Sequence, residues 1–275
     1  MNTVSCLRTL RVCSLTVTIS SLVLLAAGLV MLVLGGFEVR QVYDNIAELE
    51  ELNRPTTVYG YESRYRETQS EYERSSVALI ERAYVSGGPE APGWDSPVAI
   101  SAIVMGVSSL AFIIAMLVWV WRAHSNLQAA GIRQKYTPGK ALAAYLIPLA
   151  NLIMPFEAMR ELHNRSHGEP EDFAHSTVED VTAWWTALAV GLVIFSMMVL
   201  KFALDLSSNL VIMTPLWMEY AITCFAVVLL LGSAFLFSNL ARKITAAQAE
   251  YLPTIDPEDF AREEIARPSV RIVGG

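Results

Sequence analysis

Residues 141–156 read ALAAYLIPLANLIMPF, and this uncharged stretch decides how the chain is threaded through a membrane. Pro148, Asn151 and Pro155 interrupt it. A straight helix of this length would rise only about 24 Å, which is less than the roughly 30 Å of a bilayer's hydrocarbon core. We therefore expect the segment to be re-entrant or to lie at the membrane interface, and not to cross.

The composition is that of a multi-pass membrane protein. Of the 275 residues, 53% are hydrophobic and only 17% are charged, whereas soluble domains have about 25% charged residues. Windows without charge, each long enough for a membrane helix, cover residues 12–37, 96–121, 181–200 and 220–241. We predict an all-α polytopic fold with four crossings, near residues 13–37, 97–121, 183–204 and 216–239.

Basic residues next to these windows predict the orientation. They form three groups: Arg8 and Arg11; Arg122, Arg133, Lys135 and Lys140; and Arg242 and Lys243. Cytoplasmic flanks of membrane helices are enriched in lysine and arginine. Four crossings place all three groups and both termini in the cytoplasm, whereas a fifth crossing through 141–156 would leave the last group outside. The positions of the basic groups and the short length of 141–156 thus both indicate that this segment does not cross.

The windows divide the chain into four parts. These are an N-terminal transmembrane anchor (1–37), an external helical hairpin (38–95), a membrane domain (96–243) and a cytoplasmic tail (244–275). In the hairpin, Val39, Val42, Ile46 and Leu49 follow helical spacing and predict a continuation of the first membrane helix. A second helix is expected over 62–85. The two helices either pack only on each other or dock a partner through Tyr59, Tyr61, Tyr65 and Tyr72.

Tryptophans and one lysine lie near the predicted helix ends. Trp94, Trp119, Trp121, Trp184, Trp185 and Trp217 occupy these positions. Indole rings favour the headgroup region, so we expect the tryptophans at the two membrane interfaces. Lys201, near the outer end of the third span, is expected to snorkel outward or to pair with Asp205 one helical turn further on.

The most specific pattern runs from Trp121 to Leu162. It reads R-A-x-x-N-L-x-A-x-G, then Y-T-P-G, then P-x-A-N-L-x-x-P-F-x-A-M-R-E-L. Non-helical backbone at membrane depth must find its hydrogen bonds inside the protein, and the amide of Asn151 is suited to supply them. We predict structural roles for the pattern's residues Asn126, Tyr136, Pro138, Gly139, Pro148, Asn151, Pro155, Arg160 and Glu161.

This pattern resembles the bacterial membrane proteins catalogued as domain-of-unknown-function family 4328. The resemblance continues to the pair Trp184-Trp185 and covers most of 96–243. Family members commonly carry tryptophan and glycine after the P-G turn, where this chain has Lys140, Ala143, Ala144 and Tyr145. The resemblance implies a multi-pass fold in the bacterial inner membrane and no established activity.

The sequence holds no strong signal for catalysis, a cofactor or a metal. His163, His167 and Glu171 are spaced four apart, but Gly168 and Pro170 break the helix that would align them, and His175 lies in a polar connection. No P-loop, HExxH or GxSxG motif is present. We expect a non-enzymatic protein without metal or cofactor, with membrane lipids and other membrane subunits as partners, a possible homo-oligomer, and no nucleic acid.

Two functions therefore compete. The first is an accessory or scaffolding subunit of a larger membrane complex, with the external hairpin as its docking element. The second is a small transporter or channel that uses the broken segment 141–156 as its solute site, since broken helices commonly form such sites. The near absence of ionisable residues in the spans favours the first.

Overall fold

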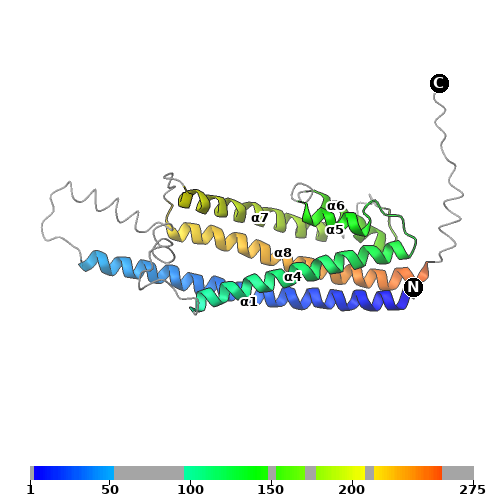
Figure 1. The fold of residues 1–275 in the computed structure, drawn as a ribbon, viewed down its shortest axis with the longest axis horizontal. Helices are drawn as coiled ribbons and strands as arrows, with labels where there is room; N and C mark the ends of the chain where they lie inside the picture. Colours follow the sequence, from blue (N-terminus) through cyan, green and yellow to red (C-terminus); the bar gives the residue numbers. More distant parts are fainter. Residues whose placement is uncertain (1–2, 53–95, 148–152, 171–177, 208–213, 256–275) are drawn as a thin grey trace, which may run out of the picture. The chain divides into compact units, whose positions relative to one another are not determined.

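The computed structural model describes residues 3–52, 96–147, 153–170, 178–207 and 214–255 (Figure 1). Every regular element in these ranges is a helix, so the predicted all-α fold is confirmed. The elements are α1 (Thr3–Leu52), α4 (Pro97–Ala129), α5 (Pro138–Leu146), α6 (Met154–Ser166), α7 (Val178–Ser207), α8 (Leu216–Tyr251) and the 3-10 turn η3 (Leu252–Thr254).

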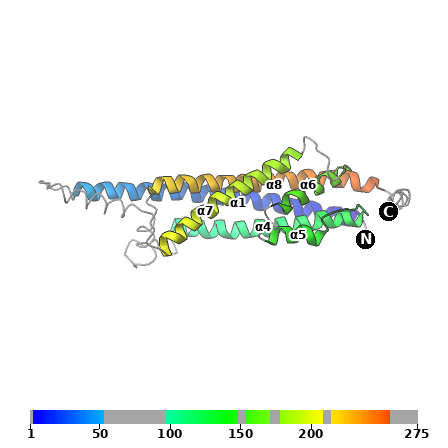
Figure 2. The same ribbon diagram turned by 90° about the horizontal axis from the view of Figure 1, so that it is seen from above.

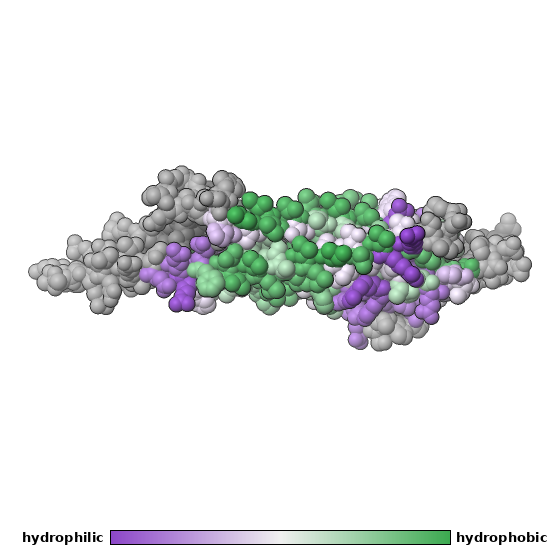
Figure 3. Space-filling model, turned by 90° about the horizontal axis from the view of Figure 1, so that it is seen from below, coloured by the Kyte–Doolittle hydropathy of each residue, from purple (hydrophilic) through white to green (hydrophobic). Residues whose placement is uncertain are grey.

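Four of these helices are long and apolar enough to cross a membrane. The candidate spans are Cys6–Gln41, Ala99–Ala129, Glu179–Leu204 and Leu216–Thr254. They confirm the four predicted spans, and the surface of the helices is rich in hydrophobic residues (Figure 3). The helices are longer than the predicted crossings, and α1 continues as a helix to Leu52. The predicted second hairpin helix, 62–85, lies outside the described residues.

The chain divides into two compact units. Unit one contains Met1–Leu22, Ala111–Thr186 and Ser233–Gly275, and unit two contains Val23–Leu110 and Ala187–Gly232. Helix α4 ends in unit one and α7 begins there, so the intervening chain starts and finishes in the same unit. Within this intervening chain, α5 has 9 residues and α6 has 13, both too few to cross a bilayer as a helix.

Aromatic side chains form the centre of unit one. The ring of Phe237 on α8 lies 5.5 Å from Trp119, 5.4 Å from Trp184 and 6.2 Å from Phe112, measured between ring centroids. Both tryptophans are buried, and the Nε1–H of Trp119 donates a hydrogen bond to Thr245 at 3.1 Å. The bundle itself therefore supplies the apolar surroundings of these two indoles, and their position at a membrane interface stays a prediction.

In the described part of unit two, close helix contacts and a mostly buried ion pair join the helices. A Cβ on Gly28 of α1 would lie 2.6 Å from the side chain of Leu231, so this side chain packs directly on the backbone of α1 there. Lys201 Nζ lies 2.8 Å from Glu219 Oε1, and the two side chains are only 16% and 11% exposed. Sequence spacing suggested Asp205 as the partner; its side chain lies outside the described part.

Candidate functional site

Unit one brings the residues of the central pattern together, starting where α4 ends. Gly131 has φ +81°, a left-handed conformation that favours glycine and stops the helix. The N–H of Ile132 donates to the carbonyl of Leu127 at 3.0 Å, which satisfies one of the last carbonyls of α4. The chain then runs through residues 132–137 to the start of α5. Figures 1 and 2 show α5 and α6 beside this end of α4.

Glu161 of α6 binds the backbone of this connection. Its carboxylate accepts the N–H of Lys135 at 2.5 Å and the N–H of Tyr136 at 3.0 Å. In the sequence, Glu161 follows Lys135 by 26 residues and Tyr136 by 25. The residue is only 4% exposed. A buried carboxylate is costly unless strong hydrogen bonds replace its hydration, and two charge-assisted N–H donors do so here. We call this arrangement the Glu161 clamp.

Glu157, one helical turn before Glu161, holds the same two residues by their side chains. Its Oε2 accepts the hydroxyl of Tyr136 at 2.6 Å and lies 3.1 Å from Lys135 Nζ. These two hydrogen bonds lower the pKa of Glu157 below its ordinary value. Burial, and then the bond to Glu157, raise the pKa of Tyr136. At neutral pH the carboxylate is therefore charged and the phenol keeps its proton.

The connection leads directly into α5. Thr137 is extended (φ −62°, ψ 159°), and the buried Pro138 occupies the first turn of the helix. Proline suits that position because its fixed φ is already helical and the missing N–H would have no partner within the helix. Gly139 is exposed, and a Cβ there would meet nothing within 4 Å. The clamp thus fixes where α5 begins.

A second set of polar groups joins α4, α6 and α8. The side-chain amide of Gln248 on α8 donates to the carbonyl of Ala123 and to Ser166 Oγ, both at 3.1 Å. Its oxygen accepts Asn126 Nδ2 at 3.5 Å. Gln248 is fully buried, so each of these partners replaces a lost hydrogen bond to water. We call these groups the Gln248 network.

The pattern residues do not all meet in one place. Glu161 and Tyr136 belong to the clamp and Asn126 to the Gln248 network, while Pro155 is buried at the start of α6 and Arg160 is half-buried further along it. The remaining pattern residues, Pro148 and Asn151, and the predicted partner-binding residues Tyr59, Tyr61, Tyr65 and Tyr72 lie outside the described residues.

Gln248 and Glu157 were not among the predicted site residues. Gln248 falls in the segment that the sequence suggests is a polar tail. Its signal was the four-residue spacing Leu240, Ile244, Gln248, which continues the buried face of the last span. Glu157 precedes Glu161 by one helical turn, which places both carboxylates on one face of α6.

His163 of α6 and His167, the residue that caps this helix, lie close together with their rings tilted by 32°. The rings of His163 and His167 are 4.4 Å apart between centroids, and His167 Nδ1 lies 2.7 Å from the carbonyl of His163. Within the described ranges, no group of three or more His, Cys, Asp or Glu residues has the geometry to hold a metal ion. Glu171 and His175 are not among those residues.

Comparison with known proteins assigns the chain to a family. Neither the curated proteins nor the solved structures contain a match to it. A family model described as "Domain of unknown function (DUF4328)" matches residues 90–246, which include α4 to α7, nearly all of α8, the Glu161 clamp and Asn126 of the Gln248 network. This is a helical membrane-type chain, and it belongs to the DUF4328 family.

Proposed function

We propose that the chain is a non-enzymatic accessory or scaffolding subunit of a larger bacterial membrane complex, with α7 as its partner-binding face inside the bilayer. The observation that carries the proposal is the burial of the spans. In α7 only 6% of the apolar window is buried within the chain, against 22% in α1 and α4 and 39% in α8. A span that packs so little on its own chain leaves its surface for a helix of another subunit.

The chemistry of the family pattern supports a non-enzymatic role. The oxygens of Glu157 and Glu161 accept hydrogen bonds from the chain's own Lys135 and Tyr136. A general acid or base would instead have to reach a proton of a substrate. The carboxylates therefore fix the positions of α5 and α6. This structural role suits a subunit that functions by binding other proteins.

The membrane and orientation are part of the proposal. We place the chain in the bacterial inner membrane with both termini in the cytoplasm, because Arg8, Arg11, Arg242 and Lys243 all belong to unit one, together with the basic connection 130–140. The external hairpin 38–95, with Tyr59, Tyr61, Tyr65 and Tyr72, is the second proposed docking element.

Site-specific photo-cross-linking in the native membrane tests the role of α7. A photoreactive amino acid at Met197 of α7, which is 66% exposed, should form an adduct with another protein. The matched control is Val107 of α4, which is 63% exposed and should meet mainly lipid. Mass spectrometry of the adduct identifies the partner or a second copy of the chain. If Met197 yields no more protein adduct than Val107, α7 is not a docking face.

The alternative function, a small transporter, draws support from one observation. Lys201 and Glu219 form an ion pair between two apolar spans, and ionisable groups in such spans commonly mark transport pathways. The two functions are separated by reconstitution of the purified chain in liposomes. Solute uptake by the chain alone would contradict the accessory role, and uptake that is lost in the folded double variant Lys201→Met/Glu219→Leu would assign the pathway to this pair.

A further inference from the structure

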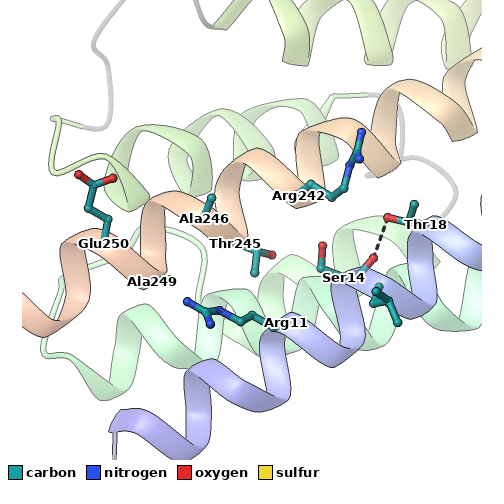
Figure 4. Close-up of a pocket in the computed structure, with 9 residues that line it drawn as sticks. Arg11, Ser14, Thr18, Arg242, Thr245, Ala246, Ala249 and Glu250 are labelled. Atoms are coloured by element: carbon teal, nitrogen blue, oxygen red, sulfur yellow. Dashed lines mark hydrogen bonds between the residues drawn. The ribbon is translucent and has the colours of Figure 1, made fainter.

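A groove in unit one lies between the start of α1 and the end of α8 (Figure 4). Its volume is about 580 Å³. The residues that matter here are Arg11, Ser14 and Leu15 from α1 and Arg242, Thr245 and Glu250 from α8. All six belong to unit one, and neither the Glu161 clamp nor the Gln248 network uses the groove.

The two arginines lie at the edge of the apolar spans. Arg11 directly precedes the uncharged window 12–37, and Arg242 directly follows the uncharged window 220–241. Side chains at such boundaries reach the depth of the lipid headgroups. Two arginines therefore line the groove at the depth where phosphates of a bilayer leaflet are found, with Arg11 extending along the groove and Arg242 extending from α8 away from α1 (Figure 4).

Hydrogen-bond donors in the groove remain available for a ligand. Among the described residues, none forms a hydrogen bond or ion pair with the Arg11 side chain. Arg242 donates through Nη2 to Asn239 and keeps its other N–H groups. Ser14 is only 4% exposed, its hydroxyl points toward α8 in Figure 4, and no described group accepts from it. The hydroxyl of Thr245, by contrast, already bonds to Ala241 and Trp119.

Glu250 is the one acid in this set. No described ion pair joins it to Arg11 or to Arg242. Two arginines and one glutamate leave a net charge of +1, so the groove attracts an anion while the carboxylate limits its affinity. Guanidinium groups bind phosphate oxygens with two parallel hydrogen bonds, which makes a phosphate group the best-fitting anion.

An apolar face continues from the groove along α1. Leu15, Ile19 and Leu22 are 62%, 54% and 53% exposed, and their spacing places them on one side of the helix. A phosphate with acyl chains fits both features, because its headgroup meets the arginines while a chain lies along these side chains. We propose that this groove binds the headgroup of an anionic phospholipid.

Lipid binding to the full-length protein in mild detergent tests the proposal. Native mass spectrometry would compare phosphatidylglycerol with phosphatidylcholine of the same acyl chains. We expect a preference for phosphatidylglycerol that weakens at least about tenfold in Arg11→Gln/Arg242→Gln, which corresponds to about 1.4 kcal/mol. The control Arg133→Gln/Lys140→Gln removes the same charge from exposed positions outside the groove and should keep the preference.

A third variant keeps the test decisive if the arginine variant does not fold. Glu250→Gln removes the repulsive carboxylate and should bind phosphatidylglycerol several-fold more tightly. The proposal is overturned by equal binding of the two lipids, by an equal loss in the Arg133/Lys140 control, or by unchanged binding in Glu250→Gln. Competition by inorganic phosphate at the lipid's own concentration would overturn it as well, since the site would then be one for a soluble anion.

Discussion

The two units of the chain bury polar groups in different ways. Unit one joins side chains to backbone groups of distant segments, through the Glu161 clamp and the Gln248 network. The described part of unit two joins regular helices, through apolar faces, a close glycine contact at Gly28, the Lys201–Glu219 pair and a hydrogen bond from the Tyr220 hydroxyl to the carbonyl of Leu32. The first arrangement fixes where irregular chain must lie, and the second only holds regular helices side by side.

Breaking the ion pair of unit two should have the largest effect on stability. Lys201→Met leaves Glu219 charged and mostly buried, which costs about 3–4 kcal/mol. The double variant Lys201→Met/Glu219→Leu removes both charges and should regain most of that loss. Thermal unfolding in detergent measures both.

The control for these Lys201 and Glu219 variants is an exposed ion pair. Arg40 and Asp44 lie one turn apart on α1 with side chains 77% and 70% exposed, so Arg40→Gln should leave the melting temperature nearly unchanged. If Lys201→Met is as mild as Arg40→Gln, the pair is not a stabilising element of unit two, and the contrast between the units is larger than we infer.

Breaking the clamp of unit one should come next. Glu161→Ala leaves the N–H groups of Lys135 and Tyr136 without their acceptor at a site that is 4% exposed, and we expect a loss of about 2–3 kcal/mol. Glu161→Gln keeps an amide oxygen and should lose less. Thermal unfolding, with hydrogen exchange at these two amides, checks the assignment.

Glu157, which binds the side chains of the same two residues, provides the comparison with the clamp. Its side chain is 39% exposed and bonds only to side chains, so Glu157→Gln should be milder than Glu161→Ala. Equal losses in the two variants would show that the backbone bonds of Glu161 are not what holds the connection before α5.

Charge-free windows were enough to predict the four spans, because length and hydrophobicity decide whether a helix can cross a bilayer. The helix ends were less predictable: α8 continues to Tyr251 through residues that look polar in sequence, since Gln248 is buried by its partners on α4 and α6. The burial of Trp119 and Trp184 also could not be predicted from the sequence, because it depends on how Phe237 and its neighbours pack.

Only part of the candidate site was predicted, and the reason is related: its contacts join residues that are far apart in the sequence. The family pattern drew attention to Tyr136 and Glu161, but no spacing rule indicates that a carboxylate binds backbone N–H groups 25 and 26 residues earlier. The Lys201–Glu219 pair was missed in the same way. Sequence spacing favours partners within one helical turn, whereas this partner comes from the next helix.

The smallest expected effect is a pH dependence that arises in unit one. Burial lowers the pKa of His163 below its ordinary value of 6.5, and the neighbouring His167 lowers it further. Below pH 6.5 the unfolded chain therefore takes up a proton that the folded chain resists, so stability falls as the pH drops from 6.5 toward the lower folded pKa. Melting temperatures at pH 7.5 and 5.5 should show this fall in the wild-type chain.

Substitution of each histidine identifies the source of this fall. His163→Gln removes the buried imidazole and should reduce the difference between the two pH values, whatever it does to stability at pH 7.5. His167→Gln should reduce it less, because burial, the larger cause of the lowered pKa, remains. An undiminished difference in His163→Gln would mean that acid acts elsewhere in the chain, and that the buried polar groups of α6 do not set the pH response of unit one.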